Sequence, residues 1–140
     1  MKSTNTYLTF GGNCRQAMEF YEQCVGGKLN VMPFSAAPPE AQPKDEKLKN
    51  NIMHAHLENG PFLLMASDGM PGMPVQHGNN FHINLNCESE QEIEKLFKAL
   101  GAGGQVIVPL NDTFWGARFG LLKDKFGIGW MFNYDKQQHA

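Results

Sequence analysis

Residues 113–133 read Thr-Phe-Trp-Gly-Ala-Arg-Phe-Gly-Leu-Leu-Lys-Asp-Lys-Phe-Gly-Ile-Gly-Trp-Met-Phe-Asn and include both tryptophans of the chain. Charged residues and a glycine at 123–127 interrupt the apolar segments, a pattern that is typical of a turn between two strands. We therefore expect a hairpin with strands at 116–122 and 128–134. Side chains alternate between the two faces of each strand, but the sequence alone does not determine which faces coincide.

The same stretch concentrates aromatic side chains and glycines around a single arginine. Rigid apolar walls with few polar groups are typical of a small-molecule cavity. We expect ligand contacts from Trp115, Phe119 and Trp130, with Arg118 orienting an anionic or carbonyl-bearing group. Two alternatives stay open: the aromatic residues form an ordinary core hairpin, or Arg118 pairs with a neighbouring carboxylate such as Asp112 or Asp124.

Length and composition indicate one domain with an ordinary core. A chain of 140 residues can bury about two thirds of its unfolded surface without metal or disulfide staples. The net charge is −2, and Lys and Arg are scattered along the sequence. The sequence therefore shows no basic patch of the kind that binds nucleic acid, and we expect a small-molecule partner. We find no signal peptide or membrane span and expect a cytoplasmic protein. The three cysteines lack CxxC spacing and predict neither a disulfide framework nor a thiolate zinc site.

The two halves of the chain repeat one order of elements. In the first half, a strand at 7–10 precedes a helix that Asn13 begins and Gly26 ends. In the second half, a strand at 81–87 precedes a helix that Ser89 begins in a capping box. Three further strands follow each helix, so the sequence predicts two β-α-β-β-β modules.

Equivalent apolar pairs on the two predicted helices support an internal duplication, because Phe20-Tyr21 and Leu96-Phe97 lie 76 residues apart. We place module 1 at about 5–68 and module 2 at about 80–135, joined by a linker rich in Gly, Pro and Met. Within module 1, the proline-rich and charged residues 35–50 predict a solvated loop that can cover a site.

This duplicated order resembles the vicinal-oxygen-chelate superfamily, which includes glyoxalase I, bleomycin-resistance proteins and extradiol dioxygenases, and most closely its PhnB-like branch. The resemblance implies a single α+β domain over 1–140, in which the two tandem modules form a cupped mixed sheet around a small-molecule site. It also implies a homodimer, because the superfamily commonly pairs modules across chains. The residues that carry the resemblance are Tyr7 to Cys14, Ala17 with Phe20-Tyr21, Ile52 to Ala55, Met65 to Asp68, Thr113 to Gly116, Asp124 to Gly127, and Trp130-Met131.

The resemblance also implies metal ligands, usually His, Gln or Glu, on the first and last strands of each module. In this sequence those positions fall near Thr6, near Leu64 or Met65, on His82 and on Met131. Only His82 is an ordinary ligand, and a catalytic ion normally needs about three protein ligands. We therefore expect the inherited metal site to be degenerate and no cofactor to be bound.

Two histidines offer an alternative metal site. His54 and His56 project from one face of a predicted strand at 51–57, and with His82 from another strand they would supply three imidazole ligands. The alternative function is a metal-dependent lyase, isomerase or dioxygenase that polarises vicinal oxygens at a divalent ion. In the metal-free interpretation, His54 contacts the ligand directly. A third possibility is a purely structural protein whose own aromatic side chains fill the cavity.

No catalytic residue is identifiable from the sequence. Cys14 lies near a helix start, the one thiol whose position would lower its pKa. Some members of the PhnB-like branch carry a ubiquinone methyltransferase label, which would normally need a glycine-rich turn between a strand and a helix. Here Gly127–Gly129 precedes a predicted strand and Gly101–Gly104 follows a predicted helix, so we expect no methyltransferase activity.

Overall fold

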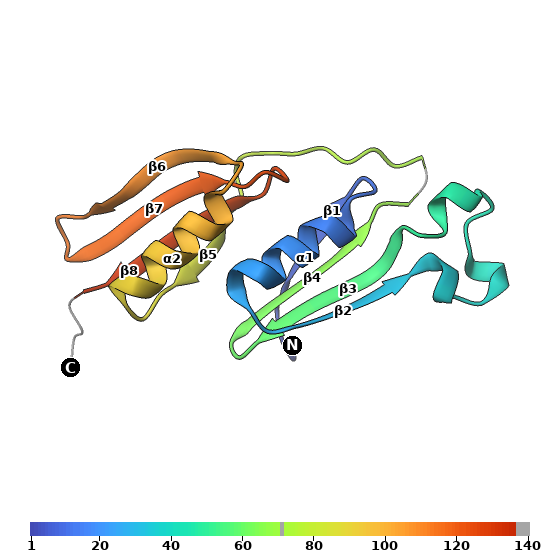
Figure 1. Cartoon of the computed structure of the whole chain (residues 1–140), viewed down its shortest axis with the longest axis horizontal. Helices are drawn as coiled ribbons and strands as arrows, with labels where there is room; N and C mark the ends of the chain where they lie inside the picture. Colours follow the sequence, from blue (N-terminus) through green and yellow to red (C-terminus); the bar gives the residue numbers. More distant parts are fainter. Residues whose placement is uncertain (71, 137–140) are drawn as a thin grey trace. The chain divides into compact units, whose positions relative to one another are not determined.

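The computed structural model describes residues 1–70 and 72–136, and the chain divides into two compact units, Met1–Gln76 and His77–Ala140. The first unit contains β1 (Thr6–Phe10), α1 (Cys14–Val25), β2 (Lys28–Pro33), β3 (Ile52–Asn59) and β4 (Phe62–Asp68), shown in Figure 1. The second unit contains β5 (Ile83–Asn86), α2 (Glu90–Gly101), β6 (Gln105–Asp112), β7 (Ala117–Lys123) and β8 (Gly129–Asp135). Across the described ranges, no helix is long and apolar enough to cross a membrane.

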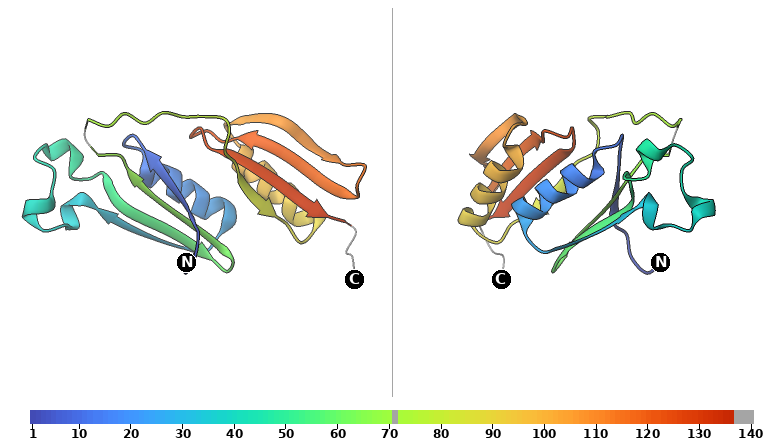
Figure 2. Two further views of the ribbon diagram at one scale, coloured as in Figure 1. Left: turned by 180° about the vertical axis from the view of Figure 1, so that it is seen from behind. Right: turned by 45° about the vertical axis from the view of Figure 1, so that its right-hand side comes forward.

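Each unit forms its own four-stranded mixed sheet. The strand order is β1-β4-β3-β2 in the first unit and β5-β8-β7-β6 in the second. In both sheets the first strand of the module runs parallel to the last, and the other neighbours are antiparallel. Figure 2 shows the same arrangement from two further directions. The predicted α+β class with two tandem β-α-β-β-β modules is therefore confirmed.

The helix of each module packs on its own sheet through an apolar stripe. α1 contacts β2, β3 and β4, and α2 contacts β6, β7 and β8. The buried residues of α1 are Cys14, Ala17, Met18, Tyr21 and Cys24, which recur at helical spacing. Tyr21 of the predicted apolar pair Phe20-Tyr21 is among them, whereas Phe20 is only half-buried.

The start of α1 is stabilised by Asp68, at the far end of β4. The buried Asp68 carboxylate accepts hydrogen bonds from the backbone N–H groups of Gly12 (2.9 Å) and Cys14 (3.0 Å) through Oδ1. Its Oδ2 accepts from the N–H of Ile52 (2.7 Å), the first residue of β3. Asn13 occupies the N-cap position, as predicted, but its side chain makes no capping hydrogen bond. An acceptor from another strand takes its place.

The start of α2 follows the predicted capping box. Ser89 Oγ accepts from the N–H of Glu92 at 3.1 Å, and Glu92 Oε1 accepts from the N–H of Glu88 at 2.8 Å. The first strand of this module is shorter than predicted, because only Ile83–Asn86 pair with β8.

The predicted hairpin at 123–127 is confirmed, and a second buried carboxylate holds its turn. Asp124 Oδ1 accepts from the N–H groups of Phe126 (2.8 Å) and Ile128 (3.1 Å). Asp124 Oδ2 accepts from the indole N–H of Trp130 at 2.7 Å. Since Asp124 is only 4% exposed, these three donors offset the cost of removing its charge from water.

The register of β7 and β8 shows which side chains of the two strands lie on the same face of the sheet. Gly120 lies opposite Phe132, and Leu122 lies opposite Trp130, so these residues share the face that α2 covers. A Cβ atom at Gly120 would lie 2.7 Å from Phe97 of α2. Glycine at this position therefore lets the helix approach the sheet closely, where Phe97 and Phe132 form an edge-to-face pair at 5.1 Å between ring centroids.

We predict that Asp68→Asn destabilises the protein by about 3 kcal/mol, because the amide presents an N–H donor where three backbone donors converge. Asp135→Asn is the matched control, since Asp135 also ends a last strand but is exposed, and it should change stability by less than about 0.5 kcal/mol. Urea unfolding followed by circular dichroism measures both values. Equal stabilities for the two variants would contradict the role of Asp68.

Candidate functional site

One face of the first sheet has no helix from its own unit packed on it. The strand register places one row of side chains across this face, and α1 lies on the opposite side, where Ala55, Leu57, Leu64 and Ala66 are buried. We call the side without the helix the uncovered face. The row on it consists of Tyr7, Met65, His56 and Asn30, with His54 and Met32 beside it.

The prediction that His54 and His56 share a face is confirmed, and each ring has a polar neighbour. The Tyr7 hydroxyl lies 3.2 Å from His54 Nδ1, and Asn30 Nδ2 lies 3.1 Å from His56 Nε2. The two imidazole centroids are 5.8 Å apart. Because the Asn30 amide donates to Nε2, the neutral His56 ring carries its proton on Nδ1. Within the described residues, His54 Nε2 and His56 Nδ1 make no hydrogen bond, so both nitrogens can bind a polar group.

The structure disperses the aromatic cavity predicted for the second module. Phe119 lies on the sheet face opposite α2, whereas Arg118 lies on the α2 side. Trp130 is fully buried on that same side, so its ring gives a ligand no access within the unit. Trp115 lies in the turn between β6 and β7, where the residue is 59% exposed and its ring contacts that of Phe114 edge to face, with 4.8 Å between the ring centroids. The open alternative, an aromatic-rich core hairpin, describes Trp130 better.

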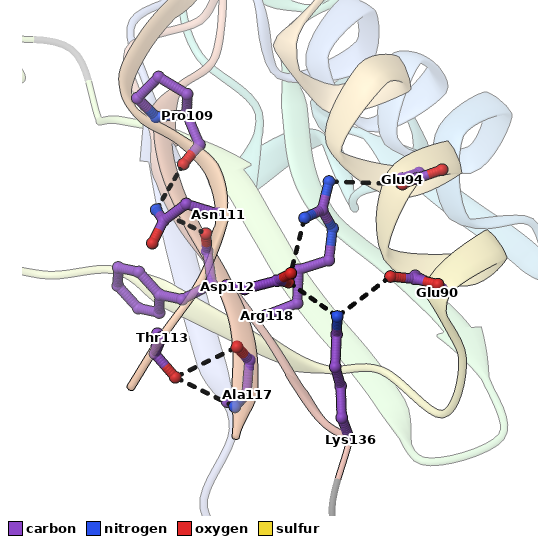
Figure 3. A network of polar contacts seen from close by, with 10 residues as sticks. Glu90, Glu94, Pro109, Asn111, Asp112, Thr113, Ala117, Arg118 and Lys136 are labelled. Carbon is purple, nitrogen blue, oxygen red and sulfur yellow. Dashed lines mark hydrogen bonds and ion pairs between the residues drawn. The ribbon is translucent and has the colours of Figure 1, made fainter. Parts of the chain in front are cut away.

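Arg118 belongs to a network of ion pairs between β6, β7 and α2 (Figure 3). Its guanidinium lies 3.3 Å from Asp112 and 3.4 Å from Glu94, as the neighbour-pairing alternative anticipated. Lys136 lies 2.9 Å from Asp112 and 3.3 Å from Glu90. The hydrogen bond from Lys136 lowers the pKa of Asp112, and the same contact raises the pKa of Lys136. The charge of Arg118 is therefore already compensated by carboxylates of its own unit.

The family of the chain follows from comparison with known sequences. The sequence model of the Glyoxalase/Bleomycin resistance protein/Dioxygenase superfamily matches residues 4–132. The chain belongs to this superfamily. Among curated relatives of this superfamily member, Protein YjdN of Escherichia coli K12 is 32% identical over an alignment of 140 residues. The alignment covers 94% of this chain and 95% of that protein.

Solved structures agree with the superfamily assignment. The crystal structure of protein PA1353 from Pseudomonas aeruginosa is similar at 44% identity with a TM-score of 0.87, over 98% of this chain and 100% of that one. A Bacillus cereus protein described as a putative 3-demethylubiquinone-9 3-methyltransferase, PhnB protein, is similar at 23% identity with a TM-score of 0.76, over 95% and 99% of the two chains. The PhnB-like resemblance is confirmed at the level of the fold.

The register shows which faces the expected ligand positions of the first module occupy. Leu64 is 1% exposed on the α1 side, and Thr6 pairs with it, so neither reaches the uncovered face. The residues that do reach it on the first and last strands are Tyr7 and Met65. A phenol and a thioether are poor ligands for hard or borderline divalent ions.

The corresponding strands of the second module pair Asn84 with Met131, which supplies no carboxylate either. His82 precedes β5, and its ring packs against Gly129, where a Cβ atom would lie 2.8 Å from His82 Cδ2. In the part of the chain that the structure describes, no group of three or more His, Cys, Asp or Glu side chains is arranged to hold a metal ion. A site that combines His54, His56 and His82 stays a prediction of the alternative function.

Sequence reasoning did not identify Tyr7 and Asn30 as members of the row on the uncovered face, and it named Met65 only as one of two possible ligand positions. Asn30 and Tyr7 lie on strands that are not adjacent to each other, and only the pairing of all four strands brings them into one row. Side chains alternate between the two faces of a strand, and Met65 lies opposite His56 in the β3–β4 register. Once that register was known, Met65 could be placed on the same face as the histidines.

The expectation that the pKa of Cys14 is lowered is wrong. Burial, together with the smaller effect of the nearby Asp68 charge, raises the pKa of the Cys14 thiol to about 12. Burial likewise raises the pKa of Cys87 to about 11, with a contribution from Glu92. Both groups therefore stay protonated at neutral pH and cannot act as thiolate nucleophiles.

We predict that native protein at pH 8 reacts with a thiol reagent at Cys14 and Cys87 at least about a hundredfold more slowly than unfolded protein, because the thiolate is scarce and buried. Both pKa values lie above the ordinary value of 9.0, so the folded state holds these protons through pH 9. Labelling with iodoacetamide, followed by mass spectrometry of each cysteine peptide, measures the rates. Rapid native labelling of Cys14 would contradict the assignment.

Proposed function

We propose that this superfamily member binds a small, uncharged or weakly charged organic molecule on the uncovered face of its first sheet. The observation that supports this proposal is the pair of contacts Tyr7–His54 and Asn30–His56. Each contact occupies one ring nitrogen and leaves the other for a ligand. His56 then offers an N–H donor, while His54 offers a donor or an acceptor according to its tautomer.

The neighbours of these rings suit a carbonyl- or hydroxyl-bearing ligand with an apolar body. Met65 and Met32 flank the histidines on the same face, and Met32 is 48% exposed. Methionine side chains adapt to ligands of irregular shape. No Lys or Arg joins the row of Tyr7, Met65, His56 and Asn30. Lys28 lies one row further along the same face, but it stands opposite Glu58, so a strongly anionic ligand would meet a carboxylate beside this cation.

In the second module, Phe119 is the one member of the predicted aromatic set that lies on the sheet face opposite its helix. We propose that it contributes an apolar contact to ligand binding. Trp115 is accessible in its turn and stays a candidate contact.

The alternative function is metal-dependent lyase, isomerase or dioxygenase chemistry at His54, His56 and His82. The shared face of His54 and His56 favours it, because two imidazoles on one strand can chelate an ion once their present partners are released. We give it second place because both histidines already have polar partners, and among the described residues no group of three His, Cys, Asp or Glu side chains is arranged to hold a metal ion. The methyltransferase description of the Bacillus cereus protein does not transfer, since similarity at 23% identity shows the fold alone.

We further propose a homodimer, as the superfamily resemblance implies, and a cytoplasmic location. Light scattering at micromolar concentration should give twice the chain mass of 15.6 kDa. A measured mass equal to one chain would contradict this assembly.

The binding proposal predicts selective changes in the imidazole signals of His54 and His56. A panel of small neutral carbonyl compounds, titrated during NMR observation of the rings, should shift both signals saturably and leave that of His77 in place. Tyr7→Phe removes the partner of His54 and should weaken binding about fivefold, equivalent to one neutral hydrogen bond.

A parallel titration with zinc chloride tests the alternative function in the same untagged protein. The proposal predicts no stoichiometric zinc effect on these rings. Joint shifts of His54, His56 and His82 that saturate at about one ion per chain would replace the binding proposal with the metal-enzyme function. If no carbonyl compound shifts His54 and His56 selectively, the binding proposal also falls.

A further inference from the structure

A cavity of about 490 Å³ lies within the first unit, at the end of its sheet. One wall comes from the connection between β2 and β3, which contains three short 3-10 turns at Phe34–Ala36, Pro39–Ala41 and Glu46–Leu48 (Figure 1). The other wall comes from the segment that follows β4. The predicted covering loop at 35–50 therefore does line a cavity, although the cavity is separate from the row of residues on the uncovered face.

Backbone hydrogen bonds fix both walls to the sheet. The N–H of Phe34 donates to Asn51 O at 2.9 Å, which closes the base of the loop beside β2 and β3. The N–H of Gly69 donates to Phe10 O at 2.7 Å, which holds the start of the second wall against the end of β1. The cavity therefore lies at the end of the sheet where Asp68 binds the starts of α1 and β3.

The described residues that line the cavity include no Lys, Arg, Asp, Glu or His. The lining side chains are almost all apolar, among them Phe34, Leu48, Met70 and Met73. An ion in this cavity would lose hydration without gaining a counter-charge. The volume falls within the range of small-molecule pockets.

One polar side chain lies among these apolar side chains, and exposed backbone groups such as those of Gly11 and Gly69 add polar surface to the lining. Asn51 is half-buried, and its side-chain amide makes no hydrogen bond within residues 1–70 and 72–136. An amide offers a donor and an acceptor at one point, so it can orient a single carbonyl, hydroxyl or N–H group of a ligand. Met70 and Met73 are 66% and 67% exposed, so a bound apolar molecule would also cover methionine surface that now contacts water.

We propose that this cavity is a second binding site, distinct from the uncovered face, for an uncharged and largely apolar molecule whose one polar group pairs with Asn51. The site takes aromatic or branched aliphatic molecules that carry a carbonyl, a hydroxyl or an N–H group. It rejects the phosphorylated, sulfonated or carboxylated analogues of the same molecules.

Two fluorescent probes with the same ring system test this selectivity. N-phenyl-1-naphthylamine is neutral, and 8-anilinonaphthalene-1-sulfonate adds one sulfonate. The neutral probe should bind saturably at one site, and the sulfonate probe at least about tenfold more weakly, because its charge loses hydration without compensation. Equal affinities for the two probes would overturn the proposal.

Variants locate the site. Met73→Glu places a carboxylate on an exposed part of the wall and should weaken the neutral probe at least about tenfold. Asn51→Leu, which removes the amide, should weaken it about fivefold. Ile107→Glu is the matched control on exposed β6, and it should leave probe affinity unchanged. Unchanged affinity in Met73→Glu, with a native circular dichroism spectrum, would overturn the assignment to this cavity.

Discussion

The buried carboxylate of Asp68 is the interaction on which the first module depends. A charged group that is 3% exposed is costly unless donors surround it, and three backbone N–H groups do so. These donors belong to the start of α1 and the start of β3, far from Asp68 in the sequence. One side chain therefore fastens the end of β4 to two other elements.

The position of these ends determines the chemistry of the uncovered face. A shift of β3 by one residue relative to β4 would turn His54 and His56 toward α1 and bring Ala55 to the face where a ligand is proposed. The same fastening point holds the base of the cavity lined by Phe34 and Asn51, since Asp68 binds the N–H of the residue that follows Asn51. The hydrogen bonds of Asp68 therefore stabilise the fold and also hold in place the strands that carry both proposed binding surfaces.

The sequence was sufficient to predict features that depend on local pattern. Helical spacing, the Ser89 capping box and the charged turn around Asp124 indicated the β-α-β-β-β order of each module correctly. Features that depend on long-range pairing were not accessible. Asp68 replaces Asn13 as the acceptor at α1, although 54 residues separate it from Cys14. The pairing of β7 with β8 placed Trp130 in the core, which its aromatic character could not reveal.

Native-state hydrogen exchange tests the central role of Asp68 most directly. If its carboxylate fastens α1 and β3 to β4, the amides of Gly12, Cys14 and Ile52 should exchange only through global unfolding, with the same protection free energy as the centre of β3. Gly12 and Cys14 lie at a helix start, where amides without such an acceptor exchange readily. Fast exchange at these three amides, while the centre of β3 stays protected, would contradict the account.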